Sequence, residues 1–113
     1  VRSKGTPTTR RESMLTLRIE HPITDFETWS AAFNRFADAR RQAGVISHRV
    51  QRPVDGENFV LIDLDFETKE AAEGFLNFLT TTVWARPENS PGLAGTPQAR
   101  ILTDALTDLV SGA

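Results

Sequence analysis

The stretch Phe59–Phe66, FVLIDLDF, decides the fold because its residues alternate between the two sides of an extended chain. One side is apolar throughout and carries Val60, Ile62, Leu64 and Phe66. The other side is half apolar and half acidic and carries Phe59, Leu61, Asp63 and Asp65. This pattern predicts a strand with one face in the core and a second face that requires both apolar and polar neighbours.

Further strands flank this stretch in the sequence. Residues 15–19 alternate apolar and polar side chains, and residues 99–103 (ARILT) form a short apolar segment. Residues 45–53 lead into the central strand through Asp55-Gly56, a dipeptide typical of hairpin turns because both residues tolerate a positive φ. We therefore expect four strands, two of them joined by a tight turn.

Two segments have the apolar periodicity of helices. Residues 26–43 carry an aromatic stripe at three- and four-residue steps, begin after a Thr24–Glu27 capping-box spacing and end at Gly44. Residues 67–84 carry a second apolar stripe, and the β-branched run near the end of this segment predicts fraying. Residues 85–98 contain three prolines and two glycines and are expected to form a loop.

The order of these elements is β-α-β-β-α-β, the split arrangement of ferredoxin-like α+β domains. It predicts a four-stranded antiparallel sheet with both helices on one face and no cover from the same chain on the other. We expect the folded domain to span residues 14–103. Residues 1–13 are expected to be a disordered N-terminal segment and residues 104–113 a C-terminal tail.

Composition excludes several classes of function. The chain has 113 residues and no cysteine, which removes disulfides, thiolate catalysis and thiolate metal sites. Positions 14–113 hold nine basic and fourteen acidic residues, a balance unlike that of a nucleic-acid-binding protein. No apolar run approaches the roughly 20 residues of a membrane span and no signal peptide pattern opens the chain, so we expect a cytoplasmic protein with no membrane partner.

The register of the hairpin decides which side chains share the second face. With a two- or four-residue loop, His48 stands directly across from Asp63, whereas a three-residue loop separates them. In the first register the open face collects four apolar and four polar side chains, which are Ile46, Val50, Phe59, Leu61, His48, Arg52, Asp63 and Asp65. Burial of the four apolar ones is worth roughly 6 to 12 kcal/mol. We therefore expect a second copy of the sheet to cover this face.

The sequence resembles a known superfamily in several motifs. These are the helix FETWSAAFNRF, the hairpin HRVQRPVDGENFVLIDLDF with the helix ETKEAAEGF after it, and the Pro/Gly loop before ARIL. Together they resemble the dimeric α+β barrel superfamily over residues 14–103. Its members include cofactor-free antibiotic-biosynthesis monooxygenases, haem-degrading monooxygenases and small isomerases. The resemblance implies a homodimer with a pocket between the open sheet face and the helices, and we expect no cofactor; it does not imply one chemistry.

His48 and Asp63 are the candidate catalytic residues, because a carboxylate opposite an imidazole fixes the ring tautomer and raises the pKa of the ring. We expect a ligand to contact Arg18, Phe59, Leu61, Asp65, Trp84 and Arg100. Two functions fit these residues. One is a cofactor-independent monooxygenase or isomerase that acts on a small, partly apolar organic compound. The other is a non-catalytic ligand-binding or structural homodimer whose polar sheet face only locks the interface.

Other residues are assigned structural roles. Trp29 is expected in the core, His21 at a surface turn, and Asp65 in an ion pair with Arg18 across neighbouring strands. Phe78 stands where the haem-degrading members have a tryptophan, and the chain lacks the tyrosine that the antibiotic-type members employ. Two histidines this far apart, with no clustered carboxylates, predict no dedicated metal site.

Overall fold

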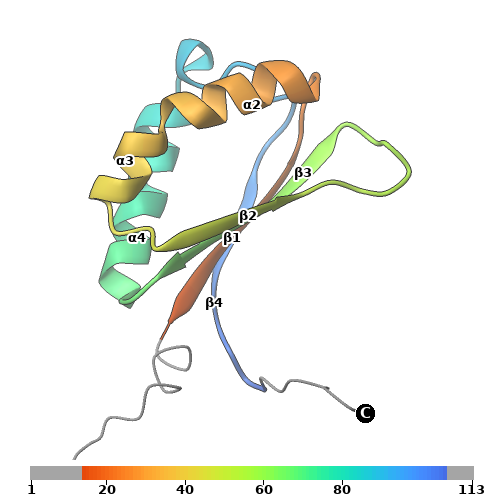
Figure 1. Cartoon of the computed structure of the whole chain (residues 1–113). Coiled ribbons are helices and arrows are strands. Elements are labelled where there is room, and N and C mark those ends of the chain that lie inside the picture. Colours follow the sequence, from red (N-terminus) through yellow and green to blue (C-terminus); the bar gives the residue numbers. More distant parts are fainter. Residues whose placement is uncertain (1–13, 107–113) are drawn as a thin grey trace, which may run out of the picture.

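The computed structural model describes residues 14–106 and shows the predicted element order with extra helical turns (Figure 1). The strands are β1 (Leu15–Pro22), β2 (Ser47–Gln51), β3 (Phe59–Phe66) and β4 (Gln98–Thr103). The helical elements are α2 (Phe26–Arg35), α3 (Ala37–Gln42), α4 (Lys69–Phe78), the π-helical turn η1 (Leu79–Val83) and the 3₁₀ turn η2 (Pro87–Asn89). The predicted N-terminal segment 1–13 and residues 107–113 of the predicted tail lie outside the described residues.

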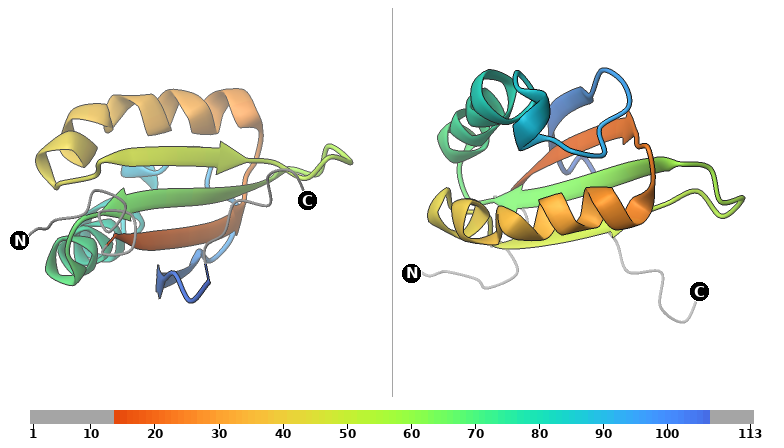
Figure 2. Two further views of the ribbon diagram at one scale, coloured as in Figure 1. Left: turned by 60° about the horizontal axis from the view of Figure 1, so that its bottom comes forward. Right: turned by 90° about the horizontal axis from the view of Figure 1, so that it is seen from above.

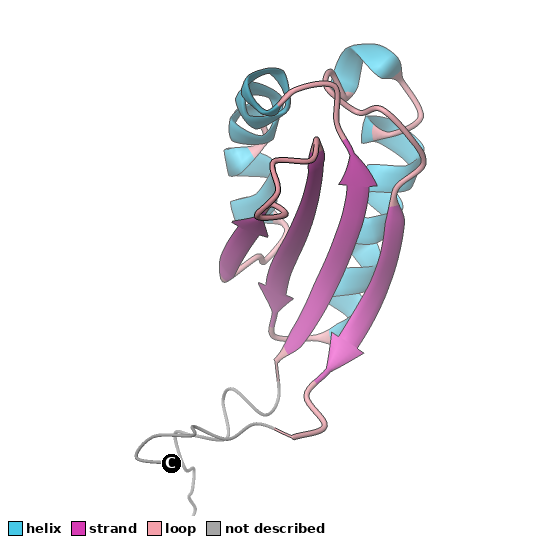
Figure 3. Ribbon diagram, turned by 90° about the vertical axis from the view of Figure 1, so that its right-hand side faces the viewer, coloured by secondary structure: helices cyan, strands magenta, loops and turns pink. Residues whose placement is uncertain are grey.

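The four strands form one antiparallel sheet in the order β2-β3-β1-β4. The helices α2, α3 and α4 lie on the same side of this sheet, and Figures 2 and 3 show no described helix on the opposite side. This arrangement is the ferredoxin-like α+β architecture that the order of elements predicted. Within residues 14–106 it leaves the other face of the sheet without a helix, and this is the open face.

The core lies between the helices and the inner face of the two central strands. The apolar side of β3 is buried as predicted, with exposed fractions of 4% or less for Val60, Ile62, Leu64 and Phe66. The inner residues of β1 and the helices complete this cluster with Leu17, Ile19, Trp29, Ala72 and Phe75. Because each large apolar side chain contributes roughly 1.5–3 kcal/mol when fully buried, this layer is the main source of stability.

The predicted first helix is divided into two. The chain leaves helical geometry at Phe36, with φ −98° and ψ 17°, so that α2 and α3 point in different directions. The prediction that Thr24 caps this helix is also wrong. The cap is Asp25, whose carboxylate accepts a hydrogen bond from the Thr28 N–H at 2.8 Å. The predicted end at Gly44 agrees with the structure, where this glycine has a φ of +98°.

The second helix changes its winding where fraying was predicted. Thr68 caps α4 by accepting a hydrogen bond from the Ala71 N–H at 3.1 Å. At the other end the hydroxyls of Thr80 and Thr81 donate back to carbonyls of α4, at 2.9 and 2.7 Å. Each hydroxyl donates to a carbonyl that would accept a backbone N–H in a regular α-helix. This hydrogen bonding is compatible with the wider π-helical turn. The turn ends where the Trp84 N–H donates to the Leu79 carbonyl at 2.7 Å.

The hairpin has the other register from the one used to place His48. His48 lies opposite Leu64, so the predicted pairing of His48 with Asp63 is wrong. The cause is the turn, in which Gly56 has a φ of +85° and donates its N–H to the Pro53 carbonyl at 3.2 Å. With this turn an odd number of residues separates Gln51 from Leu61, the pair of opposite residues nearest the turn. A shift of one residue moves every side chain of a strand to the opposite face.

The corrected register exchanges the two faces of β2. Val50 now packs beside the core, and the guanidinium of Arg52 lies 4.6 Å from the ring centre of Phe26 on α2. The predicted open-face positions of His48, Val50 and Arg52 are therefore wrong. Ser47, Arg49 and Gln51 take their places on the open face. The open face is consequently more polar than the sequence alone suggested.

The loop after η2 is tied to the start of α2. Leu93 forms a bridge with Ile23, and the Thr24 N–H donates to the Gly92 carbonyl at 2.8 Å. Gly92 has a φ of +90°, and a Cβ at this position would lie 2.8 Å from the Cα of Trp29. Glycine is required at this contact for both reasons. The contact holds the Pro/Gly-rich loop against the helix that carries Trp29.

Replacement of Gly92 by alanine is expected to lower the free energy of unfolding by about 2 kcal/mol or more, because left-handed backbone strain and steric overlap add together. Gly56→Ala is the matched control, since Gly56 also has a positive φ but no atom within 4 Å of the added Cβ. This control is expected to cost only about 1 kcal/mol. Urea denaturation measures both losses, and equal losses would contradict the proposed steric requirement.

Candidate functional site

The open face of the sheet carries rows of side chains that cross the four strands. The rows are Ser47-Asp65-Thr16-Leu102, Arg49-Asp63-Arg18-Arg100 and Gln51-Leu61-Glu20-Gln98. Three arginines and three carboxylates stand among these twelve residues, so the charges balance. The middle row, however, contains three arginines and one carboxylate. Positive charge is therefore concentrated across the centre of this face.

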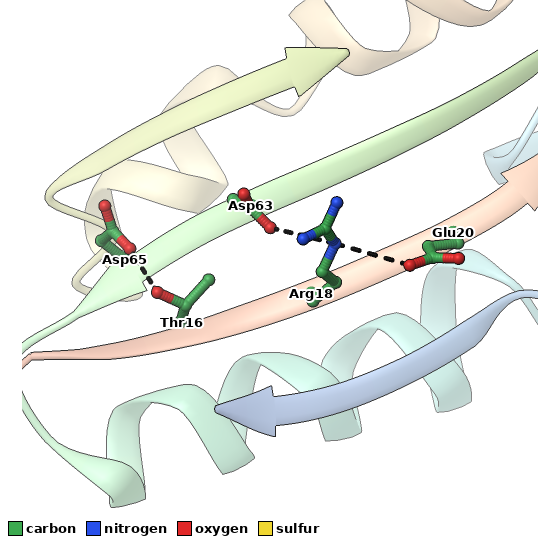
Figure 4. Close-up of polar contacts among 5 residues, drawn as sticks. All are labelled: Thr16, Arg18, Glu20, Asp63 and Asp65. Carbon is green, nitrogen blue, oxygen red and sulfur yellow. Dashed lines mark hydrogen bonds and ion pairs between the residues drawn. The ribbon is translucent and has the colours of Figure 1, made fainter. Parts of the chain in front are cut away.

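Arg18 is the hub of the polar contacts on this face (Figure 4). Its Nε atom lies 3.5 Å from Oδ1 of Asp63 and 3.5 Å from Oε2 of Glu20. The predicted ion pair with Asp65 is therefore replaced by one with Asp63, which stands opposite Arg18 in the register. Nε of Arg18 and Oδ1 of Asp63 are buried but make no hydrogen bond within the described part of the chain.

Asp65 belongs to the neighbouring row. Its carboxylate accepts hydrogen bonds at 2.7 Å from the hydroxyls of Thr16 and Ser47, on the two strands beside it. These contacts join β1, β3 and β2 at one end of the sheet. Asp65 is therefore placed for a structural role in the sheet.

The sequence-predicted site residues do not form one cluster. Arg18, Phe59, Leu61, Asp63, Asp65 and Arg100 lie on the open face. His48 is exposed on the other side of the sheet, with its ring centre 5.3 Å from that of Phe33. Trp84 lines a cavity on the helix side. The sheet thus separates the two members of the predicted acid/base pair.

A cavity of about 80 Å³ lies between the helices and the inner face of the sheet. Most of its wall is aromatic or aliphatic and includes Trp29, Phe33, Phe36, Phe75, Phe78 and Trp84. Since an apolar cavity of about 150 Å³ holds one benzene molecule, an aromatic ligand requires this cavity to widen. One wall is formed by residues that lie outside the sheet and the α-helices, which are Trp84, Asn89, Ser90, Pro91 and Leu93.

His21 brings a base to this apolar wall. Its side chain is only 3% exposed, and its Nδ1 lies 2.9 Å from the carbonyl oxygen of Pro22. A carbonyl oxygen can only accept, so Nδ1 carries the proton and Nε2 keeps a free lone pair. Burial lowers the pKa of His21 below its ordinary value, although the hydrogen bond to Pro22 opposes part of this effect. The ring is therefore a neutral base at neutral pH.

Arg40 brings a cation to the same cavity. Its side chain is 7% exposed, its Nη1 donates to the Phe33 carbonyl at 2.6 Å, and its guanidinium carbon lies 3.7 Å from the centre of the Phe33 ring. Burial lowers the pKa of Arg40 from its ordinary value. Arginine nevertheless stays protonated under ordinary conditions. The cavity thus contains one neutral base and one permanent positive charge.

Sequence reasoning missed both of these residues, although a signal for each was present. His21 continues the inward alternation of Leu17 and Ile19 on β1, but its position before Pro22 at a strand end suggested a surface turn. Arg40 falls on the aromatic stripe of the first helical segment. A charged residue at such a position is commonly exposed, so only the packing shows its burial.

Residues 14–106 contain no group of three or more His, Cys, Asp or Glu side chains placed to hold a metal ion. Among the same residues, no helix has the length and apolar character needed to cross a membrane.

Solved structures with the same fold include a monooxygenase from Streptomyces coelicolor, determined in complex with nanaomycin D. It is 18% identical, with a TM-score of 0.64, and the match covers 94% of this chain and 100% of that one. SnoaB, a cofactor-independent oxygenase from Streptomyces nogalater, is 19% identical with a TM-score of 0.61, over 84% of this chain and 96% of that one. A dimeric ferredoxin-like protein from an uncultured marine organism is 7% identical with a TM-score of 0.59, over 84% and 98%.

These likenesses confirm the predicted resemblance at the level of the fold. No family model matches the sequence, and no curated protein matches it either. At identities below 20% the shared architecture does not transfer an activity. The chemistry of this chain depends on the residues of its own cavity.

The chain is expected to lose stability as pH falls below about 6.5, the pKa of an unperturbed histidine. Because burial lowers the pKa of folded His21, the unfolded state binds more protons in this range, and the stability held by the neutral ring is lost as pH falls toward the folded pKa. His21→Gln should flatten this part of the profile, whereas His48→Gln, at an exposed position, should not. Thermal unfolding between about pH 5 and 7.5 measures the difference; parallel profiles for all three proteins would contradict it.

Proposed function

We propose that the cavity between the helices and the sheet binds a small, partly apolar organic molecule, and that His21 acts there as a general base in a cofactor-independent oxygenation. The observation that carries this proposal is the Nε2 lone pair of a buried, neutral imidazole in a wall that is mostly aromatic or aliphatic. The hydrogen bond from Nδ1 to the Pro22 carbonyl keeps the ring in the tautomer that a base requires. This proposal replaces the pair of His48 and Asp63.

The reaction begins with transfer of a proton from an acidic C–H group of the ligand to Nε2 of His21. The remaining carbanion, conjugated with a neighbouring carbonyl group, gives its electrons to O₂ directly, so the substrate itself supplies the reducing power. When a CH₂ group is oxidised in this way, one oxygen atom becomes the product carbonyl and the other leaves as water with the two hydrogens. The apolar wall favours the reaction by keeping bulk water from the anion.

Two of the structural neighbours support this proposal by their descriptions. One is a monooxygenase with an organic ligand, nanaomycin D, and the other is a cofactor-independent oxygenase. The alternative is a non-catalytic ligand-binding protein, which would use the same cavity without proton transfer. Binding and turnover therefore have to be measured separately.

The chain offers a direct reporter of cavity occupancy. Its two tryptophans, Trp29 and Trp84, both line the cavity. A ligand that enters should therefore change the intrinsic fluorescence of the protein. Nanaomycin D is a suitable first binding probe, and anthrone, an aromatic ketone with an acidic CH₂ group, is a suitable substrate probe because its oxidation to the quinone changes its absorbance.

His21→Gln is expected to reduce the rate of anthrone oxidation about a hundredfold or more, because general base catalysis contributes effects of this size. Glutamine retains a donor for the Pro22 carbonyl, so the fluorescence response to binding should persist. His48→Gln is the matched control and should oxidise anthrone at the wild-type rate. Oxygen uptake and absorbance measure turnover.

Each other outcome assigns the function differently. If the fluorescence of the wild type shows binding but the protein takes up no oxygen, the non-catalytic alternative would be favoured. Loss of activity in His48→Gln with full activity in His21→Gln would contradict the role of His21. Absence of both binding and turnover would contradict the cavity as the ligand site.

We also propose that the open sheet face pairs with a second copy of the chain. Arg18 and Asp63 keep buried polar atoms there without hydrogen bonds, and Arg49 and Arg100 are exposed beside them. A second copy related by a two-fold axis would offer carboxylates to these arginines and bury the half-exposed side chain of Leu61. One structural neighbour is described as a dimeric ferredoxin-like protein, which supports this arrangement.

Leu61→Arg is expected to weaken dimerisation at least a hundredfold, because it places a further unpaired positive charge at the centre of the paired faces. Val54→Arg makes the same kind of change in the hairpin loop, where the side chain is fully exposed, and should leave the dimer intact. Sedimentation equilibrium measures both dissociation constants. A monomeric wild type, or equal effects of the two substitutions, would contradict pairing through this face.

A further inference from the structure

The geometry of the cavity points to a particular class of ligand: we propose that Arg40 binds an anionic oxygen group, a carboxylate or an ionised phenol, on an aromatic or similarly apolar molecule. This inference rests on the proposed ligand site and deepens it by naming the chemistry of the molecule. It does not depend on whether His21 catalyses a reaction.

Arg40 is buried and has no anionic partner among the described residues. Within residues 14–106 no carboxylate forms an ion pair with Arg40. Its neighbour Arg41 is exposed and pairs with Asp38. Arginine is almost never buried unless it is paired, because removing its charge from water is costly. Arg40, the more buried of the two, is thus the one that lacks a partner.

Most donors of the Arg40 guanidinium make no hydrogen bond within residues 14–106. The group has five N–H donors, and its one hydrogen bond among the described residues is that from Nη1 to the Phe33 carbonyl. That contact helps to end α2 and gives Arg40 a structural role. No nitrogen of Arg40 is both buried and without a partner, so the donors left over keep some surface at which another group can form a hydrogen bond. The ring of Phe33 covers one side of the guanidinium, with 3.7 Å between the guanidinium carbon and the ring centre.

Arg40 gives the cavity a positive electrostatic potential. Among the described residues that line the cavity there is no aspartate or glutamate, and Arg40 is the only one with a permanent charge. His21 is neutral, so nothing in the wall offsets the positive potential of the guanidinium. In a surrounding of low polarity a charge interacts much more strongly than in water. An anionic ligand would be stabilised there, whereas a neutral ligand would leave the buried cation uncompensated.

The remaining wall indicates what is attached to the anionic group. Trp29 stacks on Phe33, with ring centres 5.0 Å apart, and Phe75 and Phe78 lie with ring centres 5.7 Å apart on the other helix. Flat aromatic surfaces of this kind favour an aromatic body for the ligand. A planar guanidinium matches the two oxygens of a carboxylate or the single oxygen of a phenolate. The predicted ligand is therefore an aromatic acid or a phenol in its ionised form.

Benzoate and benzamide test this inference, because they have nearly the same shape and differ in charge. Binding to the wild-type protein is measured by tryptophan fluorescence and by calorimetry. We expect benzoate to bind about tenfold to a hundredfold more tightly than benzamide, the range expected for hydrogen bonds to a charged group. This comparison requires no variant, so it stands even where a substitution impairs folding.

Arg40→Met should remove the preference, so that benzoate binds no more tightly than benzamide. Arg40→Lys keeps the charge without the planar fork and should keep part of the preference. Arg41→Met is the matched control on the same helix, because Arg41 is exposed and outside the cavity, and it should bind both probes as the wild type does. Melting temperatures show which variants are folded.

4-Nitrophenol distinguishes the two sources of the anionic oxygen. If a phenolate is accepted, the wild-type protein should lower the pKa of bound 4-nitrophenol, seen as the colour of the ionised form at a pH where the free compound is neutral. Arg40→Met should lose this shift. Benzoate binding without the 4-nitrophenol shift would restrict the ligand to carboxylates.

Equal affinity for benzoate and benzamide, or an unchanged preference in a folded Arg40→Met variant, would overturn the inference while leaving the cavity as a binding site. Failure of both probes to bind, together with failure of nanaomycin D to change the fluorescence, would overturn the inference and the proposed ligand site together. If nanaomycin D and benzamide bind but benzoate does not, only the prediction that the ligand is anionic would be overturned.

Discussion

The rest of the structure depends on the packing of the inner face of β3. This strand lies between β2 and β1, so the side that it buries decides which side of both neighbours faces the helices. Its four inner side chains are almost completely buried, and the ring of Phe66 meets that of Phe75 on α4 with centres 6.0 Å apart. Exchange of the two faces would place Asp63 and Asp65 in the core, and burying two unpaired carboxylates would exceed the stability available to a domain of this size.

The candidate ligand site is a consequence of how the helices rest on this layer. Several of the large rings that pack the core also line the cavity, so the same residues serve folding and binding. A ligand larger than the present space must displace part of the wall, and the core face of the sheet resists this because it is closely packed. The turns beyond α4 are less regular, and Gly92 ties the loop that follows them to Trp29. The segment from the turns beyond α4 to Gly92 therefore contributes to stability and also forms the wall that a larger ligand would have to displace.

The two faces of the sheet carry different chemistry, and β1 contributes to both. Outward, Arg18 contacts carboxylates on its own strand and on β3, which is the kind of network that a protein interface can complete. On the inner side, β1 contributes His21, a base. Arg40 on α3 adds a cation to the same largely apolar cavity. A base that can remove a proton and a cation that can hold an anionic ligand face the same cavity, which is why the cavity is a better candidate for chemistry than the open face.

The sequence by itself determined the order of the elements, the open sheet face and the buried side of FVLIDLDF, because alternation and helical periodicity are local properties of the chain. It did not determine the register of the hairpin, since Asp55-Gly56 permits loops of different length and one residue decides the face of His48. Only the tertiary structure showed that His21 and Arg40 share a cavity. Their burial follows from where the break at Phe36 and the loop beyond α4 place the walls, and such long-range packing leaves no pattern among neighbouring residues.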